Sequence, residues 1–253
     1  MDGILDHTMV RVEDLEESID WYTTHLDWEL KRKSEHSSFT LAFLGPEDMH
    51  EDGAVLELTY NHDGRSYDFG DAWGHIAVRT DDVYDAYEQL MDEGVEDYRD
   101  PDSCGGQYAF VRDPDGHEIE IVERDHGAPF SIDHTMIRVE NVDESIGWYT
   151  RKLDYEMFRR SEHDSFSLYF LKPEDAPEEA MSMELTYNHD GSSYDFGDAW
   201  GHVAVRADDA ELEEYWEMLM NRHAEDYRDP EDCDYNYAFT KDPDGHEIEI
   251  VRR

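Results

Sequence analysis

The chain has 253 residues, of which 66 are acidic and 21 basic, giving a formal net charge of −45. So large a negative charge argues against nucleic acid and anionic membranes as partners, because both are polyanions. High charge and low hydropathy can indicate disorder, but 13% of the residues are aromatic and strand and helix periodicities are clear. We therefore expect a folded protein.

The acidic composition is also poor in lysine, with only five lysines in the chain. Such a composition is typical of proteins from a salt-saturated cytoplasm, where a Debye length of about 3 Å or less screens the self-repulsion. No stretch approaches the ~20 apolar residues of a membrane span. We expect a cytoplasmic protein that needs high salt to fold, with Cys104 and Cys233 as free thiols.

Periodicity predicts the elements of the first half in chain order. Alternating apolar residues predict a strand at 8–12, and apolar residues at helical spacing then predict a helix over 15–26. The other expected elements are strands at 39–44, 55–60 and 74–79, a helix over 81–91, and strands at 108–111 and 118–122. The order β-α-β-β-(β), used twice, predicts an α+β fold in which antiparallel sheets carry helices on one face.

The chain is an internal tandem duplication, and four motifs recur in the same order. HTMVRVE at His7 returns as HTMIRVE at His134, ELTYNHDG stands at Glu57 and Glu184, SYDFGDAWGH at Ser66 and Ser193, and DPDGHEIEIV at Asp113 and Asp242. The repeat predicts two domains that pack together, 1–126 and 127–253. Each divides into two modules, with limits near 1–66, 67–126, 127–193 and 194–253.

Four polar residues of each half are candidate metal ligands. Because side chains alternate along a strand, His7, Glu57, His75 and Glu120 each lie opposite an aliphatic face. Two imidazoles and two carboxylates on facing strands suit a divalent ion. A solvated sheet face is the ordinary alternative for a strand Glu in so acidic a protein, and spacing alone leaves both interpretations open. His117 shares the aliphatic face, which argues against it as a ligand.

The spelling of the motifs resolves this choice. HTMVRV, VLELTYN, GHIAV and DPDGHEIEI resemble the four strand motifs of glyoxalase I (lactoylglutathione lyase), a family of the vicinal oxygen chelate superfamily. The resemblance spans essentially the whole chain, once per half. It implies paired βαβββ modules, which matches the order of elements predicted above.

The resemblance implies eight metal ligands: His7, Glu57, His75 and Glu120, and His134, Glu184, His202 and Glu249. In related homodimers each site takes two ligands from each subunit, so a fused chain would be a monomer that acts as a pseudodimer. One site would then combine the first two of these residues with His202 and Glu249. The other would combine His134 and Glu184 with His75 and Glu120.

The resemblance further implies isomerisation of the hemithioacetal of methylglyoxal and a small thiol to the S-lactoyl thioester. The ion would stabilise an enediolate by its charge, and a glutamate would move the proton. Glu120 and Glu249 are the expected bases, with Glu57 and Glu184 as their partners on the opposite side. The expected substrate-binding residues are Arg11, Asn61, Arg138 and Asn188 for the γ-glutamyl end of the thiol, and Arg99 and Arg228 for a glycyl carboxylate.

Several details stay open at this level. Asp71 and Asp198 stand where some relatives have a basic residue, so γ-glutamylcysteine competes with glutathione as the expected thiol. A histidine as first ligand resembles the class that prefers Ni²⁺ or Co²⁺, although Mn²⁺ and Zn²⁺ also suit such ligands. The alternatives are an epimerase or an extradiol dioxygenase of the same superfamily, and a metal-free protein that sequesters a ligand.

Overall fold

The computed structural model describes residues 3–125, 127–207 and 212–252. The first half contains β1 (Ile4–Arg11), α1 (Leu15–His25), β2 (Trp28–Glu35), β3 (Phe39–Pro46), β4 (Val55–Asn61), β5 (Trp73–Thr80), α2 (Val83–Asp92), β6 (Glu96–Arg99), the 3-10 helix η1 (Asp102–Cys104), β7 (Tyr108–Arg112) and β8 (Glu118–Glu123). The second half contains β9 (Ile132–Arg138), α3 (Val142–Lys152), β10 (Tyr155–Glu162), β11 (Phe166–Pro173), β12 (Ser182–Asn188), β13 (Trp200–Arg206), α4 (Leu212–Asn221), the 3-10 helix η2 (Glu231–Cys233), β14 (Tyr237–Lys241) and β15 (Glu247–Val251).

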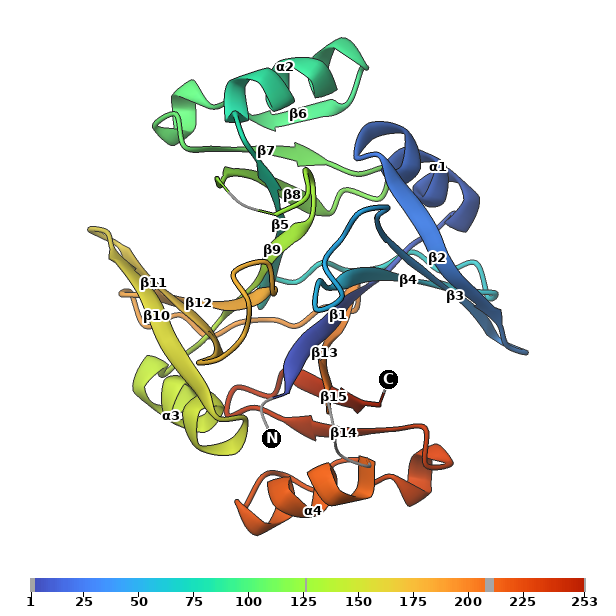
Figure 1. The fold of residues 1–253 in the computed structure, drawn as a ribbon, viewed down its shortest axis with the longest axis vertical. Helices are drawn as coiled ribbons and strands as arrows, with labels where there is room; N and C mark the ends of the chain where they lie inside the picture. The colour runs from blue at the N-terminus through green and yellow to red at the C-terminus, as the bar shows by residue number, and fades with distance from the viewer. Residues whose placement is uncertain (1–2, 126, 208–211, 253) are drawn as a thin grey trace.

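These strands form two mixed sheets, and each sheet draws on both halves of the chain. The seven-stranded sheet has the order β14-β15-β13-β1-β4-β3-β2, and the eight-stranded sheet the order β10-β11-β12-β9-β5-β8-β7-β6. The halves meet where β1 pairs with β13 and where β5 pairs with β9, both antiparallel. In Figure 1 the blue strand β1 therefore lies beside the orange and red strands at the end of the chain.

Helices cover the outer faces of the sheets, and their ends follow from local sequence. Asp14 caps α1 by accepting hydrogen bonds from the backbone N–H groups of Glu16 and Glu17, which satisfies donors that a helix start leaves unpaired. The helix buries Leu15 and Tyr22 against the sheet. In the same way Asp82 caps α2, whose buried side includes Leu90. The predicted α+β class is confirmed, but the prediction of antiparallel sheets is wrong, because β1 pairs with β4, and β5 with β8, in parallel.

The prediction missed the strands that carry few buried residues. β2 and β10 are exposed along most of their length, and β6 is a short edge strand. An edge strand has no apolar alternation because solvent takes the place of a packing partner on much of its surface. In the last module the counterpart of β6 is reduced to one isolated bridge between Arg228 and Phe239.

The two copies of the motif SYDFGDAWGH, one from each half, pass each other at the pseudo-twofold axis that relates the halves. The segments around Gly70 and Gly197 pass so closely that a Cβ atom on Gly70 would lie 2.2 Å from the carbonyl oxygen of Asp195. The Asp71 carboxylate accepts from the Asp195 N–H at 2.6 Å, and the Asp198 carboxylate accepts from the Asp68 N–H at 2.7 Å. The two aspartates thus hold the crossing together.

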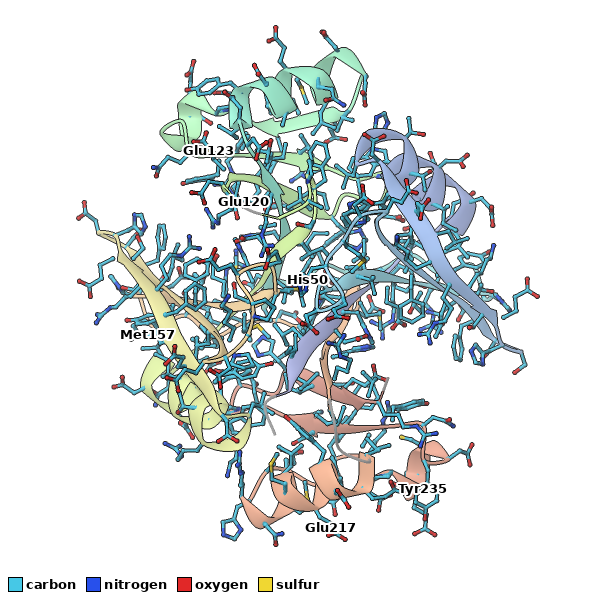
Figure 2. All side chains as sticks on the ribbon, in the orientation of Figure 1. His50, Glu120, Glu123, Met157, Glu217 and Tyr235 are labelled. Carbon is cyan, nitrogen blue, oxygen red and sulfur yellow. The ribbon has the colours of Figure 1, made fainter. Side chains whose placement is uncertain are left out.

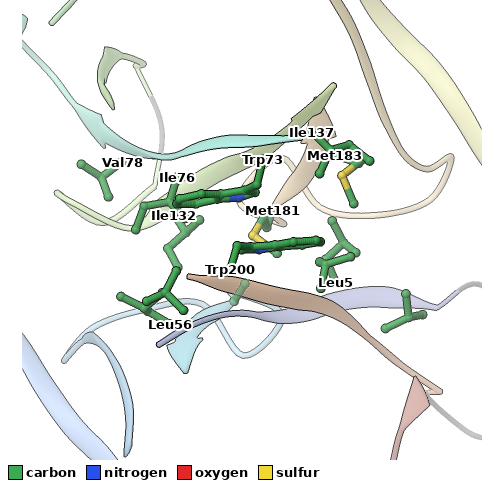
Figure 3. Close-up of a cluster of buried hydrophobic side chains, with 14 of the residues drawn as sticks. Leu5, Leu56, Trp73, Ile76, Val78, Ile132, Ile137, Met181, Met183 and Trp200 are labelled. Carbon is green, nitrogen blue, oxygen red and sulfur yellow. The ribbon is translucent and has the colours of Figure 1, made fainter. Parts of the chain in front are cut away.

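Next to this crossing, the hydrophobic core is continuous between the two sheets. The indole rings of Trp73 and Trp200 stack at a centroid distance of 6.4 Å (Figure 3). Each indole donates a hydrogen bond of 3.0 Å to a buried threonine of the other half, Thr135 and Thr8 respectively. Within the described ranges, no helix is long and apolar enough to cross a membrane. The predicted domain limits at residues 1, 126 and 253 lie outside the described residues.

Candidate metal centres

The first centre lies where β1, β4, β13 and β15 meet in the seven-stranded sheet. His7, Glu57, His202 and Glu249 are buried there, with one donor atom of each within 4.8 Å of the others. Nε2 of His7 lies 3.0 Å from a Glu57 carboxylate oxygen and 3.1 Å from one of Glu249. Nε2 of His202 lies 3.3 Å from Glu249. Two donors therefore come from each half of the chain.

The second centre repeats this arrangement in the eight-stranded sheet. His75, Glu120 and His134 form a buried group in which all donor atoms lie within 4.8 Å of one another. Glu184 completes the arrangement through a contact of 3.0 Å with His134 Nε2. Nε2 of His134 is also 3.0 Å from a carboxylate oxygen of Glu120. In Figure 2 Glu120 lies in the interior of the molecule, whereas Glu217 and Tyr235 lie at its periphery.

An aspartate directly before the first histidine of each centre orients the ring. His7 Nδ1 bonds to Asp6 at 2.9 Å, and His134 Nδ1 bonds to Asp133 at 2.8 Å. Asp133 is in turn held by Arg79 and Arg124, each at 3.0 Å. These contacts leave Nε2 as the nitrogen aimed into the centre, the usual arrangement behind a metal-ligating histidine. The sequence carries the signal, an acidic residue before His7 and His134, but strand periodicity does not assign it a role.

The electrostatics of the centres follow from this crowding of acids around imidazoles. Burial by itself lowers the pKa of His7, but its hydrogen bonds to Asp6, Glu249 and Glu57 outweigh burial and hold the pKa well above its usual value. The same balance raises the pKa of His134. Burial raises the pKa of Glu249, but His202 and His7 together lower it by more, so the net shift of this pKa is downward. The carboxylates are therefore ionised at neutral pH.

The donor set fits a divalent cation. The Nε2 atoms of His7 and His202 face each other at 3.2 Å, an arrangement natural for two lone pairs aimed at one ion. In the second centre Oε2 of Glu120 is buried and, among the described residues, has no hydrogen-bond partner of acceptable geometry. Two neutral imidazoles with two carboxylates also balance the charge of a divalent ion. Binding of the ion would displace the proton from the first histidine of the centre.

The expected substrate-binding residues lie beside the centres in two groups. Arg11 continues β1 beyond the centre, where its Nη1 donates to the carbonyls of Asp198 and Trp200 at 2.7 and 3.1 Å. Asn61 donates to the Tyr67 hydroxyl at 2.9 Å. The second half repeats both contacts, with Arg138 bound to the carbonyls of Asp71 and Trp73, and Asn188 bound to Tyr194.

The other two expected substrate ligands, Arg99 and Arg228, stack on phenylalanines that line the centres. The Arg99 guanidinium lies 4.4 Å from the ring centroid of Phe110, and that of Arg228 lies 4.0 Å from that of Phe239. Each phenylalanine packs against a histidine of a centre. No pattern in the sequence singles out these phenylalanines.

His117 lies outside the centres, in a buried network that joins modules. Its Nδ1 bonds to Asp113 at 2.9 Å, and Asp113 accepts from the Tyr22 hydroxyl of α1 at 2.9 Å. Asp115 of the same turn accepts from the backbone of Glu13 at 2.7 Å. The carboxylates of Asp113 and Asp115 are thus engaged within the protein, whereas Nε2 of His117 is buried and has no hydrogen-bond partner of acceptable geometry among the described residues. Its counterpart in the second half, around Asp242 and His246, binds Tyr149 of α3 in the same way.

Comparison with known proteins follows the same repeat. A family model described as Glyoxalase/Bleomycin resistance protein/Dioxygenase superfamily matches residues 4–121 and again residues 131–250. The chain belongs to this superfamily. A "Probable lactoylglutathione lyase, chloroplastic" of Arabidopsis thaliana is 34% identical over 211 residues, which cover 80% of this chain and 59% of that protein.

Two further relatives within the superfamily match this chain almost end to end. Glyoxalase I of Saccharomyces cerevisiae is 30% identical, with 98% of this chain and 92% of that protein covered. The crystal structure of glyoxalase I from Zea mays superposes with a TM-score of 0.84 at 29% identity and covers 99% of this chain. The predicted kinship with glyoxalase I, its enzyme class and the vicinal oxygen chelate fold are confirmed.

Proposed function

We propose that this protein isomerises the hemithioacetal of methylglyoxal and a γ-glutamyl thiol to the S-lactoyl thioester. One observation carries the proposal: two buried His₂Glu₂ centres, each assembled from both halves of the chain. The names of its relatives, lactoylglutathione lyase and glyoxalase I, agree with that reaction. A cytoplasmic location is part of the proposal, on the ground of the lysine-poor acidic composition.

The residues that would hold the divalent ion are those of the two centres. His7, Glu57, His202 and Glu249 would bind one ion, and His134, Glu184, His75 and Glu120 the other. When bound, the ion supplies positive charge that stabilises the negative charge developing on adjacent substrate oxygens. We propose Ni²⁺ or Co²⁺ as the preferred ion, with Mn²⁺ or Zn²⁺ as competitors.

The glutamates of the centres would transfer the proton. Glu249 contacts both histidines of its centre, and Glu120 contacts both of its own. Their lowered pKa values keep them ionised and able to accept a proton. Glu57 and Glu184 lie across the centre and accept a hydrogen bond from Thr59 and Thr186, at 3.1 and 3.0 Å. We assign proton abstraction to Glu249 and Glu120 because, within the described part of the chain, the polar contacts of their carboxylates are with the histidines of the centres.

The thiol would be bound along the strands that carry the ligands. Arg11 with Asn61, and Arg138 with Asn188, would take the γ-glutamyl end, since a guanidinium and an amide together suit a carboxylate beside an amine. Asp71 and Asp198, which stand at the position of a basic residue in some relatives, are committed to the crossing of the halves. We propose glutathione and γ-glutamylcysteine as the two thiols to compare.

A panel of thiols tests the proposal. Metal-free protein in molar KCl is given Ni²⁺, Co²⁺, Mn²⁺ or Zn²⁺ and assayed with methylglyoxal and each thiol for thioester absorbance. We expect turnover that depends on both the metal and a γ-glutamyl thiol. Metal-independent binding without turnover would favour the sequestering protein, and activity only on an acyl-CoA or a catechol would favour the epimerase or the dioxygenase.

A further inference from the structure

One cross-strand row is repeated in all four modules. Arg32 of β2 is the register partner of Phe43 in β3, and Phe43 is the partner of Glu57 in β4. Side chains that are partners in register share a face of the sheet. The four rows are Arg32–Phe43–Glu57, Arg228–Phe239–Glu249, Arg159–Phe170–Glu184 and Arg99–Phe110–Glu120. Each centre is therefore flanked by two rows, one from either side.

In every row the arginine stacks over the phenylalanine. The guanidinium carbon lies 3.9 Å from the ring centroid in the row of Arg32 and 3.5 Å in the row of Arg159. The rings of Phe43 and Phe170 in turn pack edge-on against His7 and His134, at 5.5 and 5.3 Å. With neighbouring strands about 4.8 Å apart, each arginine begins two strands from the glutamate and reaches back toward the centre.

β-Bulges direct these arginines. The register shifts between Leu30 and Arg32, and between Met157 and Arg159. A bulge adds one residue to a strand, so it decides on which face the following side chain lies. Without the bulge the arginine would lie on the opposite face. Figure 2 shows Met157 of β10 on this edge of the sheet.

Among the described residues, the guanidinium groups of Arg32 and Arg159 have no acidic partner, although the chain is rich in acids. Within the described ranges, Arg32 and Arg159 make neither an ion pair nor a side-chain hydrogen bond, and Nε of Arg159 is buried without a partner. The next residue on β10 behaves differently, because Arg160 pairs with Glu162. Lys33, next to Arg32, pairs with Glu16. With 66 acidic residues available, unpaired guanidinium groups beside the centres point to a ligand.

We propose that Arg32 and Arg159 bind a carboxylate of the substrate's thiol portion and thereby select an anionic substrate. Each acts across its centre from Arg228 or Arg99, so two guanidinium groups frame one substrate. Arginine suits this role because it offers a fixed fork of donors to a carboxylate while its flat face stays on the ring. The inference rests on the proposed function, since the ligand is the thiol part of that substrate.

Binding of an inert thioether tests the assignment without turnover. S-hexylglutathione and its diethyl ester, which lacks both carboxylates, are titrated calorimetrically into metal-loaded protein in molar KCl. We expect the wild-type protein to prefer the diacid by about tenfold or more, as for a charged hydrogen bond. Arg32→Met with Arg159→Met should lower the ratio of the two affinities several-fold, mainly by weakening the diacid. The arginines that remain, such as Arg11 and Arg228, should keep the ratio above one.

A matched control removes the same charge from neighbouring positions. Lys33→Met with Arg160→Met changes adjacent side chains on the same strands and should keep the preference. If circular dichroism shows that Arg32→Met with Arg159→Met does not fold, the ratio of the two affinities is measured for Arg32→Gln with Arg159→Gln instead. An unchanged ratio in the arginine variants, or no binding or no preference in the wild type, overturns the proposal. If the arginine variants lose preference for the diacid while the wild-type protein shows no methylglyoxal turnover, the proposed reaction is refuted. The assignment of the arginines is then still supported.

Discussion

The Nε2 atoms of His7 and His202, 195 residues apart in the chain, lie 3.2 Å from each other. They belong to adjacent antiparallel strands, β1 and β13, of one sheet. His75 and His134 stand in the same relation at 3.3 Å. The duplication therefore forms the centres at the junction of its copies.

Pairs of substitutions can separate crossed sites from sites confined to one repeat. His7→Ala with Glu249→Ala removes residues of one crossed centre, so the variant should keep half of the bound metal and one working site. His7→Ala with Glu120→Ala removes one residue from each centre and should lose nearly all metal and activity. Metal analysis after gel filtration, together with turnover, measures both variants. The reverse ranking would show that each repeat holds its own site.

Glu120 and Glu249, the glutamates assigned to proton abstraction, should be essential for turnover. Glu120→Gln with Glu249→Gln should lower kcat by about 10² to 10⁴, the contribution typical of general base catalysis. Glu118→Gln with Glu247→Gln changes the same strands two residues earlier and serves as the control. Stopped-flow or steady-state assays at matched metal occupancy give the comparison. Activity within a few-fold of the wild type would remove the two glutamates from the proton transfer.

The buried pair of Asp113 and His117 makes stability depend on pH. Burial alone would lower the pKa of His117, but Asp113 raises it above the ordinary 6.5. The stabilisation is therefore complete below pH 6.5 and is lost as pH rises through the folded-state pKa. Burial would raise the pKa of Asp113, but His117 lowers it below the ordinary 3.8. The stabilisation that Asp113 contributes is therefore present above pH 3.8 and is lost as the pH falls through the folded-state pKa.

His117→Gln measures this contribution. Breaking the pair should cost about 3 kcal/mol of unfolding free energy near pH 6, and the cost should shrink as the pH rises. Urea unfolding of metal-free protein at several pH values in molar KCl gives the free energies. His36→Gln is the control, because His36 is exposed and stacks on Phe39. A difference from the wild type that does not change with pH would contradict the linkage.

The crossing of the halves should tolerate no side chain at Gly70. Its φ is 58°, and an added Cβ would lie 2.2 Å from the Asp195 carbonyl oxygen. Gly70→Ala should therefore lose more stability than the roughly 1–2 kcal/mol expected for a left-handed alanine alone. Gly64→Ala is the matched control, since φ is 67° there and a Cβ would meet nothing within 4 Å. Equal melting temperatures for the two variants would refute the argument.

The net charge of −45 should make the fold depend on salt. At low ionic strength the acidic groups repel one another over a Debye length of about 30 Å, which shrinks to about 3 Å in molar salt. We expect circular dichroism and tryptophan fluorescence to report unfolding as KCl is diluted to millimolar levels, and recovery when it is restored. A cooperative thermal transition at tens of millimolar salt would show that the composition does not impose this requirement.

The sequence by itself determined the duplication, the α+β class, most of the buried strands and the identity of the eight residues of the centres. Those features are local, because alternation along a strand and the spelling of a motif are visible within a few residues. Edge strands such as β2, exposed along most of its length, leave no such alternation and escaped prediction. Aspartates such as Asp6 and phenylalanines such as Phe43 escaped because their role depends on a partner.

Tertiary structure alone decided what each residue faces. It placed His7 against His202, gave Asp71 and Asp198 a role in the crossing of the halves, and turned Arg32 toward a centre through a bulge. Motif spelling could suggest the crossed pairing only by likeness to homodimers. The pairing itself arises because β1 hydrogen-bonds to β13 rather than to β5, and no local pattern records which distant strand completes a sheet.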